Sequence, residues 1–107
     1  MRYCESPFHY RRRQTREVVV GDPSNGGIVI GGNHPIVKQS MLTSDTKDTA
    51  ACVEEASRLI EAGCELVRVT APMVKAAANL ENISRELRAR GYPTPLVADI
   101  HFLPAAA

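Results

Sequence analysis

Residues 65–70 read Glu-Leu-Val-Arg-Val-Thr, and residues 96–101 read Leu-Val-Ala-Asp-Ile-His. Both runs are short, largely apolar and rich in β-branched side chains, which is typical of strands covered on both faces. Residues 36–41, Ile-Val-Lys-Gln-Ser-Met, form a third run of this kind. These stretches predict three strands of one buried sheet.

Two stretches with helical periodicity lie between these runs. Apolar residues recur at helical spacing from Cys52 to Gly63 and again within residues 74–90. Asp48 or Thr49 can cap the first helix, and Gly63 suits the left-handed residue at its end. Strands that alternate with helices predict βαβ units and a parallel sheet with right-handed crossovers.

The chain begins with a different pattern. Residues 15–20 end in the β-branched run Val18-Val19-Val20, and residues 28–30 are a second such run. The loop between them is rich in Gly, Asn and Pro, which predicts a β-hairpin. We therefore divide the chain into an N-terminal segment with a hairpin, residues 1–34, and an α/β unit, residues 35–107.

The composition is that of an ordinary globular chain, with 44% hydrophobic and 23% charged residues. Thirteen basic and twelve acidic residues give a net charge of +1, so we expect neither nucleic acid nor a membrane surface as a partner. No run reaches the roughly 18 apolar residues of a membrane span, and no signal-peptide core is present. Three cysteines without Cys-x-x-Cys spacing indicate a reducing, cytoplasmic compartment and no metal site within the chain.

Polar groups are expected at the C-terminal end of each parallel strand, where open α/β sheets and (β/α)8 barrels bind their ligands. In strand order these groups are Lys38, Gln39 and Ser40, then Arg68 and Thr70, and then Asp99 and His101. In the following loop, Asp45 and Thr46 are placed to meet a ligand, although loop polarity alone also explains them.

Two interpretations of the strand-end charges stay open. In the first, Arg68 and Asp99 form a buried ion pair and bind no ligand. In the second, Arg68 offers its forked donors to a phosphate or carboxylate, and His101 donates to the same anion or acts as an acid or base. Asp99 then orients one of these two side chains.

Four motifs in order, RRRQTREVVVG, HPIVKQSMLTSDTKDT, EAGCELVRVTAP and PLVADIHF, resemble the N-terminal region of 4-hydroxy-3-methylbut-2-enyl diphosphate synthase. That family is the iron–sulfur oxidoreductase of the non-mevalonate (MEP) isoprenoid pathway. The opening YCES and the SDTKDT loop look closer to its larger form in plants, chlamydiae and Bacteroidetes. The resemblance covers about residues 3–107.

The resemblance implies a fold and an activity. The fold is a TIM (β/α)8 barrel preceded by a hairpin and followed by a separate domain with a [4Fe-4S] cluster. A barrel needs about 250 residues, so the chain holds the hairpin and about three βα units of an incomplete barrel. The family enzyme, which we expect to be a homodimer, reductively opens 2-C-methyl-D-erythritol 2,4-cyclodiphosphate with two electrons from ferredoxin or flavodoxin.

The resemblance also implies substrate-binding residues. The family's diphosphate-binding arginine falls on Arg68, and its Asp-x-His motif on Asp99 and His101. The further residues implied for the site are Gln39, Ser40, Met41, Thr43, Asp45 and Thr46. The cluster ligands of the family lie beyond Ala107, and Cys4, Cys52 and Cys64 match none of them. We therefore assign no catalytic residue and expect the chain to be inactive alone.

Two other functions are considered. The first is a pterin-binding barrel like dihydropteroate synthase, whose Asn-x-Thr-x-Asp-Ser-Phe loop is not reproduced by SMLTSDTKDT. The second is a non-catalytic module that assembles through its open sheet edges, because three parallel strands cannot close a barrel.

Overall fold

The computed structural model describes residues 7, 8, 10 and 12–107, so Cys4 and Arg11 lie outside the described part. The elements in chain order are β1 (Val18–Val20), β2 (Ile28–Ile30), β3 (Gln39–Met41), α1 (Thr49–Glu61), β4 (Leu66–Thr70), α2 (Val74–Ala89), β5 (Leu96–Asp99) and the short 3-10 helix η1 (Pro104–Ala106). No helix in the described part is long and apolar enough to cross a membrane.

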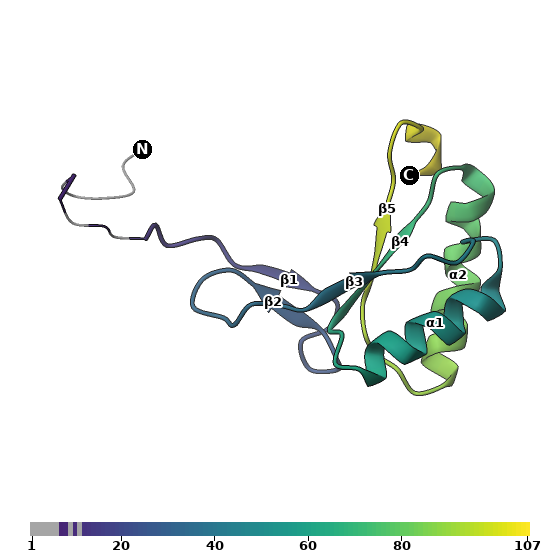
Figure 1. The fold of residues 1–107 in the computed structure, drawn as a ribbon, viewed down its shortest axis with the longest axis horizontal. Helices are drawn as coiled ribbons and strands as arrows, with labels where there is room; N and C mark the ends of the chain where they lie inside the picture. Colours follow the sequence, from purple (N-terminus) through teal and green to yellow (C-terminus); the bar gives the residue numbers. More distant parts are fainter. Residues whose placement is uncertain (1–6, 9, 11) are drawn as a thin grey trace.

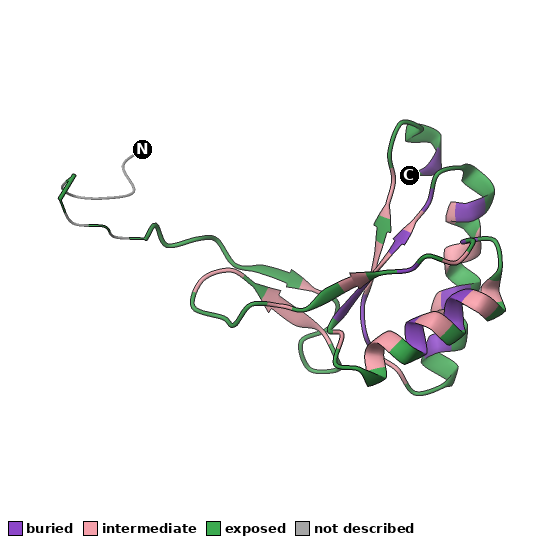
Figure 2. Cartoon of the chain, in the orientation of Figure 1, coloured by how far each residue is buried: buried purple, intermediate pink, exposed green. Residues whose placement is uncertain are grey.

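The strands β3, β4 and β5 form a parallel sheet in that order, as predicted. Arg68 of the central strand pairs with Met41 of β3 and with Val97 of β5. The helices α1 and α2 lie on one face of this sheet, and the buried positions gather between the two layers (Figures 1 and 2). In a (β/α)8 barrel the helices lie outside, so the other face of the sheet corresponds to the barrel interior.

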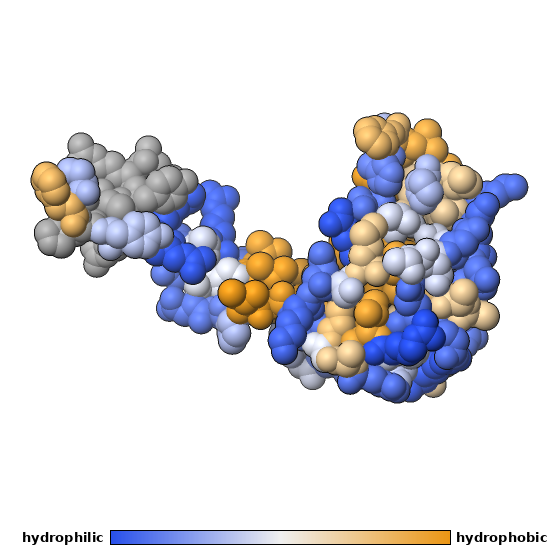
Figure 3. Space-filling model, viewed as in Figure 1, coloured by the Kyte–Doolittle hydropathy of each residue, from blue (hydrophilic) through white to orange (hydrophobic). Residues whose placement is uncertain are grey.

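The predicted hairpin is present. β1 and β2 pair antiparallel, with Val18 opposite Ile30, in a sheet that shares no strand with the parallel one. The hairpin loop packs against the segment before β5, where a Cβ on Gly26 would lie only 2.6 Å from Cγ of Pro93. Figure 3 shows apolar surface gathered where the hairpin meets the α/β unit.

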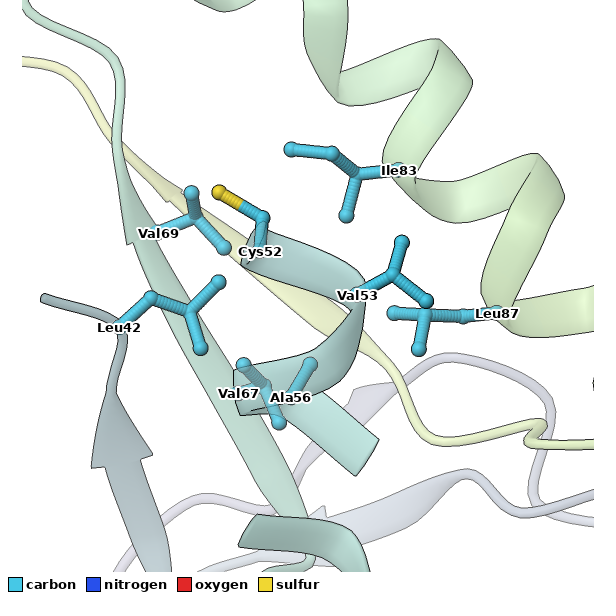
Figure 4. Packing of buried hydrophobic residues seen from close by; sticks show 8 residues of the cluster. All are labelled: Leu42, Cys52, Val53, Ala56, Val67, Val69, Ile83 and Leu87. Atoms are coloured by element: carbon cyan, nitrogen blue, oxygen red, sulfur yellow. The ribbon is translucent and has the colours of Figure 1, made fainter. Parts of the chain in front are cut away.

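The core lies between the parallel sheet and its two helices (Figure 4). Val67 and Val69 of β4 point into it, because alternate side chains of a strand share a face. Cys52 is fully buried there, and Cys64 packs against the same cluster from its edge. The buried members of the cluster are Leu42, Cys52, Val53, Ala56, Val67, Val69, Ile83 and Leu87.

The helix ends follow from local sequence. The Asp48 carboxylate accepts a hydrogen bond from the Ala51 N–H at 3.1 Å, so Asp48 and not Thr49 caps α1. Gly63 has the predicted left-handed conformation, with φ +106°. The N–H of Cys64 then donates to Leu59 O at 3.0 Å, which completes a Schellman motif.

Two strands are shorter than predicted. β3 begins at Gln39, so Lys38 precedes the strand and Gln39 lies at its start instead of its C-terminal end. β5 ends at Asp99, so His101 lies beyond the strand and does not share its face by alternation. The chain turns at Phe102, whose φ of +63° is in the left-handed region.

Candidate functional site

Arg68 marks the open face of the parallel sheet. Its side chain leaves β4 on the side opposite to Val67 and Val69, away from the helices. Nη2 of Arg68 donates to Oδ2 of Asp99 on the neighbouring strand at 2.9 Å. The Arg68 side chain is 42% exposed and the Asp99 side chain 20%. The predicted ion pair is present, but it faces an open surface instead of a buried core.

The Arg68 guanidinium retains capacity for a ligand. A guanidinium carries five N–H donors in a planar fork, and the bond to Asp99 is its only side-chain hydrogen bond within the described residues. An ion pair this open to water contributes about 0–1 kcal/mol to stability. The remaining N–H groups have the geometry that binds phosphate or carboxylate.

His101 lies next to Asp99 although it is outside the strand. Its Nδ1 is 3.6 Å from Oδ1 of Asp99, which is an ion-pair distance if the imidazole is protonated but too long for a hydrogen bond. Its ring meets Phe102 edge to face, with the ring centroids 5.0 Å apart. Asp99 therefore lies between the two side chains that could bind an anion, Arg68 and His101.

The three residues predicted from β3 lie at different places. Met41 is the register partner of Arg68, so its side chain is on the open face beside the guanidinium. Gln39 pairs with Leu66, so it is on the same face but nearer the N-terminal end of the sheet. Ser40 pairs with Val67, which places its side chain on the face covered by the helices.

The loop residues Thr43 and Thr46 have hydroxyl groups that already donate within the protein. Thr43 Oγ1 donates to Oε2 of Glu55 at 2.6 Å, and Thr46 Oγ1 donates to Thr70 O at 2.6 Å. Thr46 is only 4% exposed. Asp45 is exposed, and its Oδ1 accepts the N–H two residues later, at 3.0 Å. Thr43 is exposed as well, but its hydroxyl is bonded to Glu55, so Asp45 is the loop residue whose side chain is more open to a ligand.

Two residues that hold this loop were not predicted. Oε1 of Glu55 accepts from the N–H groups of Thr43 and Ser44 at 2.7 and 3.0 Å. Burial opposes ionisation of this carboxyl, but the hydrogen bonds from Thr43 and Ser44 outweigh it and lower the pKa of Glu55. Asn79 of α2 donates to Thr46 O at 2.8 Å. An Asn inside a helix, where its propensity is poor, is a weak signal for such a contact, and α2 has two of them, Asn79 and Asn82, so the sequence could not single out Asn79.

A hollow of about 310 Å³ lies at the C-terminal ends of β3 and β4. It is lined by the loop residues Ser44–Lys47 and by Thr70, Pro72, Met73 and Ala76. Neither Arg68 nor Asp99 lines it, so the predicted site residues do not surround one common cavity. A larger hollow, of about 590 Å³, lies between the hairpin and the start of β3, and of the predicted site residues Gln39 lines it whereas Arg68, Asp99 and His101 do not.

The charges of the candidate site nearly cancel. Arg68 contributes one positive charge, whereas Asp99 and Asp45 each contribute a negative one, and His101 adds a positive charge only when protonated. A dianionic ligand therefore finds no excess of positive charge on these residues. Tight binding of such a ligand requires further cationic groups from outside this set.

The described cysteines do not form a metal site together. Cys52 Sγ donates to Asp45 O at 3.2 Å inside the core, and Cys64 Sγ donates to Leu66 O at 2.9 Å after the end of α1. Within the described residues, no group of three or more His, Cys, Asp or Glu side chains could hold a metal ion. These residues therefore do not fit an iron–sulfur cluster.

A family model described as the GcpE TIM-barrel domain matches residues 15–107. The chain belongs to the GcpE TIM-barrel family. It is 62% identical over 105 residues to the 4-hydroxy-3-methylbut-2-en-1-yl diphosphate synthase (flavodoxin) of Akkermansia muciniphila, covering 98% of the chain and 17% of that protein. Synthases of the same name from Leptospira interrogans and Protochlamydia amoebophila are 52% and 51% identical over 106 residues, covering 99% of the chain and 15% of each protein.

Membership of the GcpE TIM-barrel family confirms the predicted fold and the resemblance to the synthase. The chain spans less than a fifth of the length of these relatives. Its three parallel strands and two covering helices are the part of a GcpE barrel that the chain contains.

Proposed function

We propose that this chain is the N-terminal barrel part of a 4-hydroxy-3-methylbut-2-enyl diphosphate synthase, and that its open sheet face supplies part of the diphosphate-binding site. The observation that carries the proposal is the half-exposed Arg68 guanidinium, which has N–H groups beyond those bonded to Asp99. The relatives that match almost the whole chain support it, because each carries this synthase name.

In this proposal the residues of the open face have separate roles. Arg68 donates parallel N–H bonds to phosphate oxygens of 2-C-methyl-D-erythritol 2,4-cyclodiphosphate, and Asp99 fixes the plane of the guanidinium through its 2.9 Å bond. His101 donates to the same anion when protonated. Met41 lies beside Arg68 on this face, and Gln39 lies on the same face nearer the N-terminal end of the sheet. Ser40, Thr43 and Thr46 support the site without touching the substrate. The Ser40 side chain is on the face covered by the helices, and the hydroxyls of Thr43 and Thr46 donate to Glu55 and to Thr70 O.

The electrons for the reductive ring opening come from outside this chain. The names of the relatives specify flavodoxin, so we propose a flavodoxin, or the related carrier ferredoxin, as the donor to the whole enzyme. Cys52 and Cys64 do not fit a cluster, so the proposed [4Fe-4S] cluster is bound by other parts of the protein. Accordingly, we propose that the chain alone does not convert the substrate and that the whole enzyme is a cytoplasmic homodimer. The GcpE match favours this function over a pterin-binding barrel.

A chimeric enzyme tests the proposal. The matching segment of the Akkermansia muciniphila synthase is replaced by this chain, and conversion of the cyclic diphosphate is measured with reduced flavodoxin. We expect the chimera to be active and Arg68→Ala to raise KM by about 10- to 100-fold, because a hydrogen bond to a charged group is worth about 1.5–3 kcal/mol. Arg68→Lys should give a smaller rise, since it keeps the charge but not the fork.

Arg85→Ala is the matched control for this experiment. Arg85 is an exposed arginine on α2 that pairs with Glu81 at 2.9 Å on the same helix, so its loss should leave KM unchanged. If Arg68→Ala binds the cyclic diphosphate as well as the parent chimera does, the diphosphate site is wrongly assigned.

A further inference from the structure

The β3–α1 loop, residues 42–48, carries Asp45 at the C-terminal ends of the strands. Its backbone is bonded to the sheet at Leu42, whose N–H donates to Arg68 O at 3.0 Å. The loop therefore begins directly beside the residue on which the proposed diphosphate site depends. Beyond Leu42, side chains from the two helices hold the loop in place.

Glu55, in the second turn of α1, reaches back to the first half of the loop. Its carboxylate accepts three hydrogen bonds: from the N–H of Thr43 at 2.7 Å, the N–H of Ser44 at 3.0 Å and the hydroxyl of Thr43 at 2.6 Å. Hydrogen bonds to an ionised acceptor are roughly twice as strong as neutral ones. One side chain thus satisfies two consecutive backbone N–H groups that no strand or helix partner reaches.

Asn79, on α2, holds the second half of the loop. Its Nδ2 donates to Thr46 O at 2.8 Å, and its Oδ1 accepts from the Thr49 hydroxyl at 3.1 Å. The Thr46 hydroxyl donates in turn to Thr70 O, at the end of β4. The loop is therefore bonded to α1, α2 and the central strand at once.

We propose that Glu55 and Asn79 are positioning residues for the substrate site, which fix the β3–α1 loop beside the end of β4 so that Asp45 faces the polyol part of the substrate. A carboxylate repels a diphosphate but accepts hydrogen bonds from hydroxyl groups, so Asp45 suits the hydroxyls of the substrate and not its phosphates. This inference rests on the proposed function, and it adds two residues that do not touch the substrate themselves.

Hydrogen exchange tests the structural half of the inference on the chain itself. In Glu55→Ala the N–H groups of Thr43 and Ser44 lose their acceptor, so we expect their exchange to rise about tenfold or more while the β4 amides stay protected. Glu54→Ala is the matched control, because Glu54 is the adjacent residue and its carboxylate pairs with Arg90 at 2.9 Å instead of the loop. Equal exchange of Thr43 and Ser44 in the parent and in Glu55→Ala would overturn the proposal.

Steady-state kinetics of the chimeric synthase test the functional half. We expect Glu55→Ala and Asn79→Ala to raise KM for the cyclic diphosphate about 3- to 10-fold with kcat changed less than about twofold, because a misplaced loop weakens the binding of substrate and transition state alike. Glu55→Gln keeps one oxygen acceptor for the two loop N–H groups and should restore part of the loss. It also serves as the second variant if Glu55→Ala does not fold.

The possible outcomes separate this inference from the proposed function. If Arg68→Ala raises KM and Glu55→Ala leaves it unchanged, the diphosphate site stands and the positioning role is wrong. If Glu55→Ala lowers KM, the Glu55 carboxylate competes with the substrate for the N–H and hydroxyl donors of Thr43 and Ser44. That result also contradicts the positioning role. If Arg68→Ala has no effect while Glu55→Ala raises KM, the loop matters and the diphosphate assignment fails.

Discussion

The Cys52 thiol is enclosed between the sheet and α1, and the residue has no exposed surface. Burial raises the pKa of this thiol, and the nearby carboxylates of Glu55, Asp48 and Asp45 raise it further. A raised pKa leaves less thiolate near neutral pH, and the thiolate is the form that reacts with alkylating reagents. Both the burial of the thiol and its raised pKa therefore protect Cys52 from alkylation.

We expect iodoacetamide to label Cys52 at least about tenfold more slowly than Cys64 in the folded chain, since Cys64 is only partly buried. Peptide mapping by mass spectrometry measures the two rates separately. In concentrated urea the two rates should become similar, which serves as the internal control. Rapid labelling of Cys52 in the folded chain would mean that this part of the core opens readily.

The positions of some site residues could be predicted from the sequence, and those of others could not. Strand alternation was enough to predict that Arg68 and Asp99 occupy comparable strand ends, and they do pair across β4 and β5. The loop threonines could not be placed in this way. The acceptor of Thr46 is Thr70 O, 24 residues away, and that of Thr43 is Glu55, 12 residues away. Only the packed fold brings such donors and acceptors together.

At the scale of elements, α1 depends on its first turn. The Asp48 carboxylate accepts the Ala51 N–H, and α1 has no acidic residue in its first turn that could compensate for the loss of Asp48. We expect Asp48→Ala to lower the free energy of unfolding by about 1 kcal/mol, the usual effect of removing an N-cap, and Asp48→Asn to retain most of it. Urea unfolding followed by circular dichroism measures both.

Lys47→Ala is the control for the capping variants. Lys47 is exposed, and it is the backbone N–H of Lys47 that donates to Asp45, a bond that the substitution keeps. Its free energy of unfolding should stay within about 0.5 kcal/mol of the parent value. Equal losses in Asp48→Asn and Asp48→Ala would show that the charge of Asp48, and not its capping bond, stabilises the helix.

The helices were predicted more accurately than the strands. Periodicity and the glycine after each helix place both ends of α1 and α2 within a few residues of the observed bounds. The length of a strand depends instead on whether a neighbouring strand pairs with it along its whole apolar run. β3 and β5 each pair only with β4 in this sheet, and both are shorter than their apolar runs, so the ends of those runs remain without a strand partner.

At the scale of the whole molecule, the parallel sheet and its two helices resemble one part of a (β/α)8 barrel that is not closed. One face of the sheet is covered by α1 and α2, whereas the edges of β3 and β5 and several apolar side chains face outward. Near the hairpin, Ile36 is 93% exposed, Val18 55% and Ile30 40%, and all three line the hollow between the hairpin and β3. In a closed barrel, such surface is covered by neighbouring strands and helices.

We therefore expect the isolated chain to self-associate as its concentration rises, because unpaired strand edges and apolar surface favour contact with a second copy. Ile36→Lys should shift the chain toward the monomer, since it places a charge on the most exposed apolar side chain of this surface without altering a strand. Ala78→Lys adds the same charge on the exposed side of α2 and should leave the association unchanged. Multi-angle light scattering over a range of concentrations measures the mass of each variant. A parent chain that remains monomeric at high concentration, or an equal shift by both lysine variants, would show that the hairpin surface does not drive association.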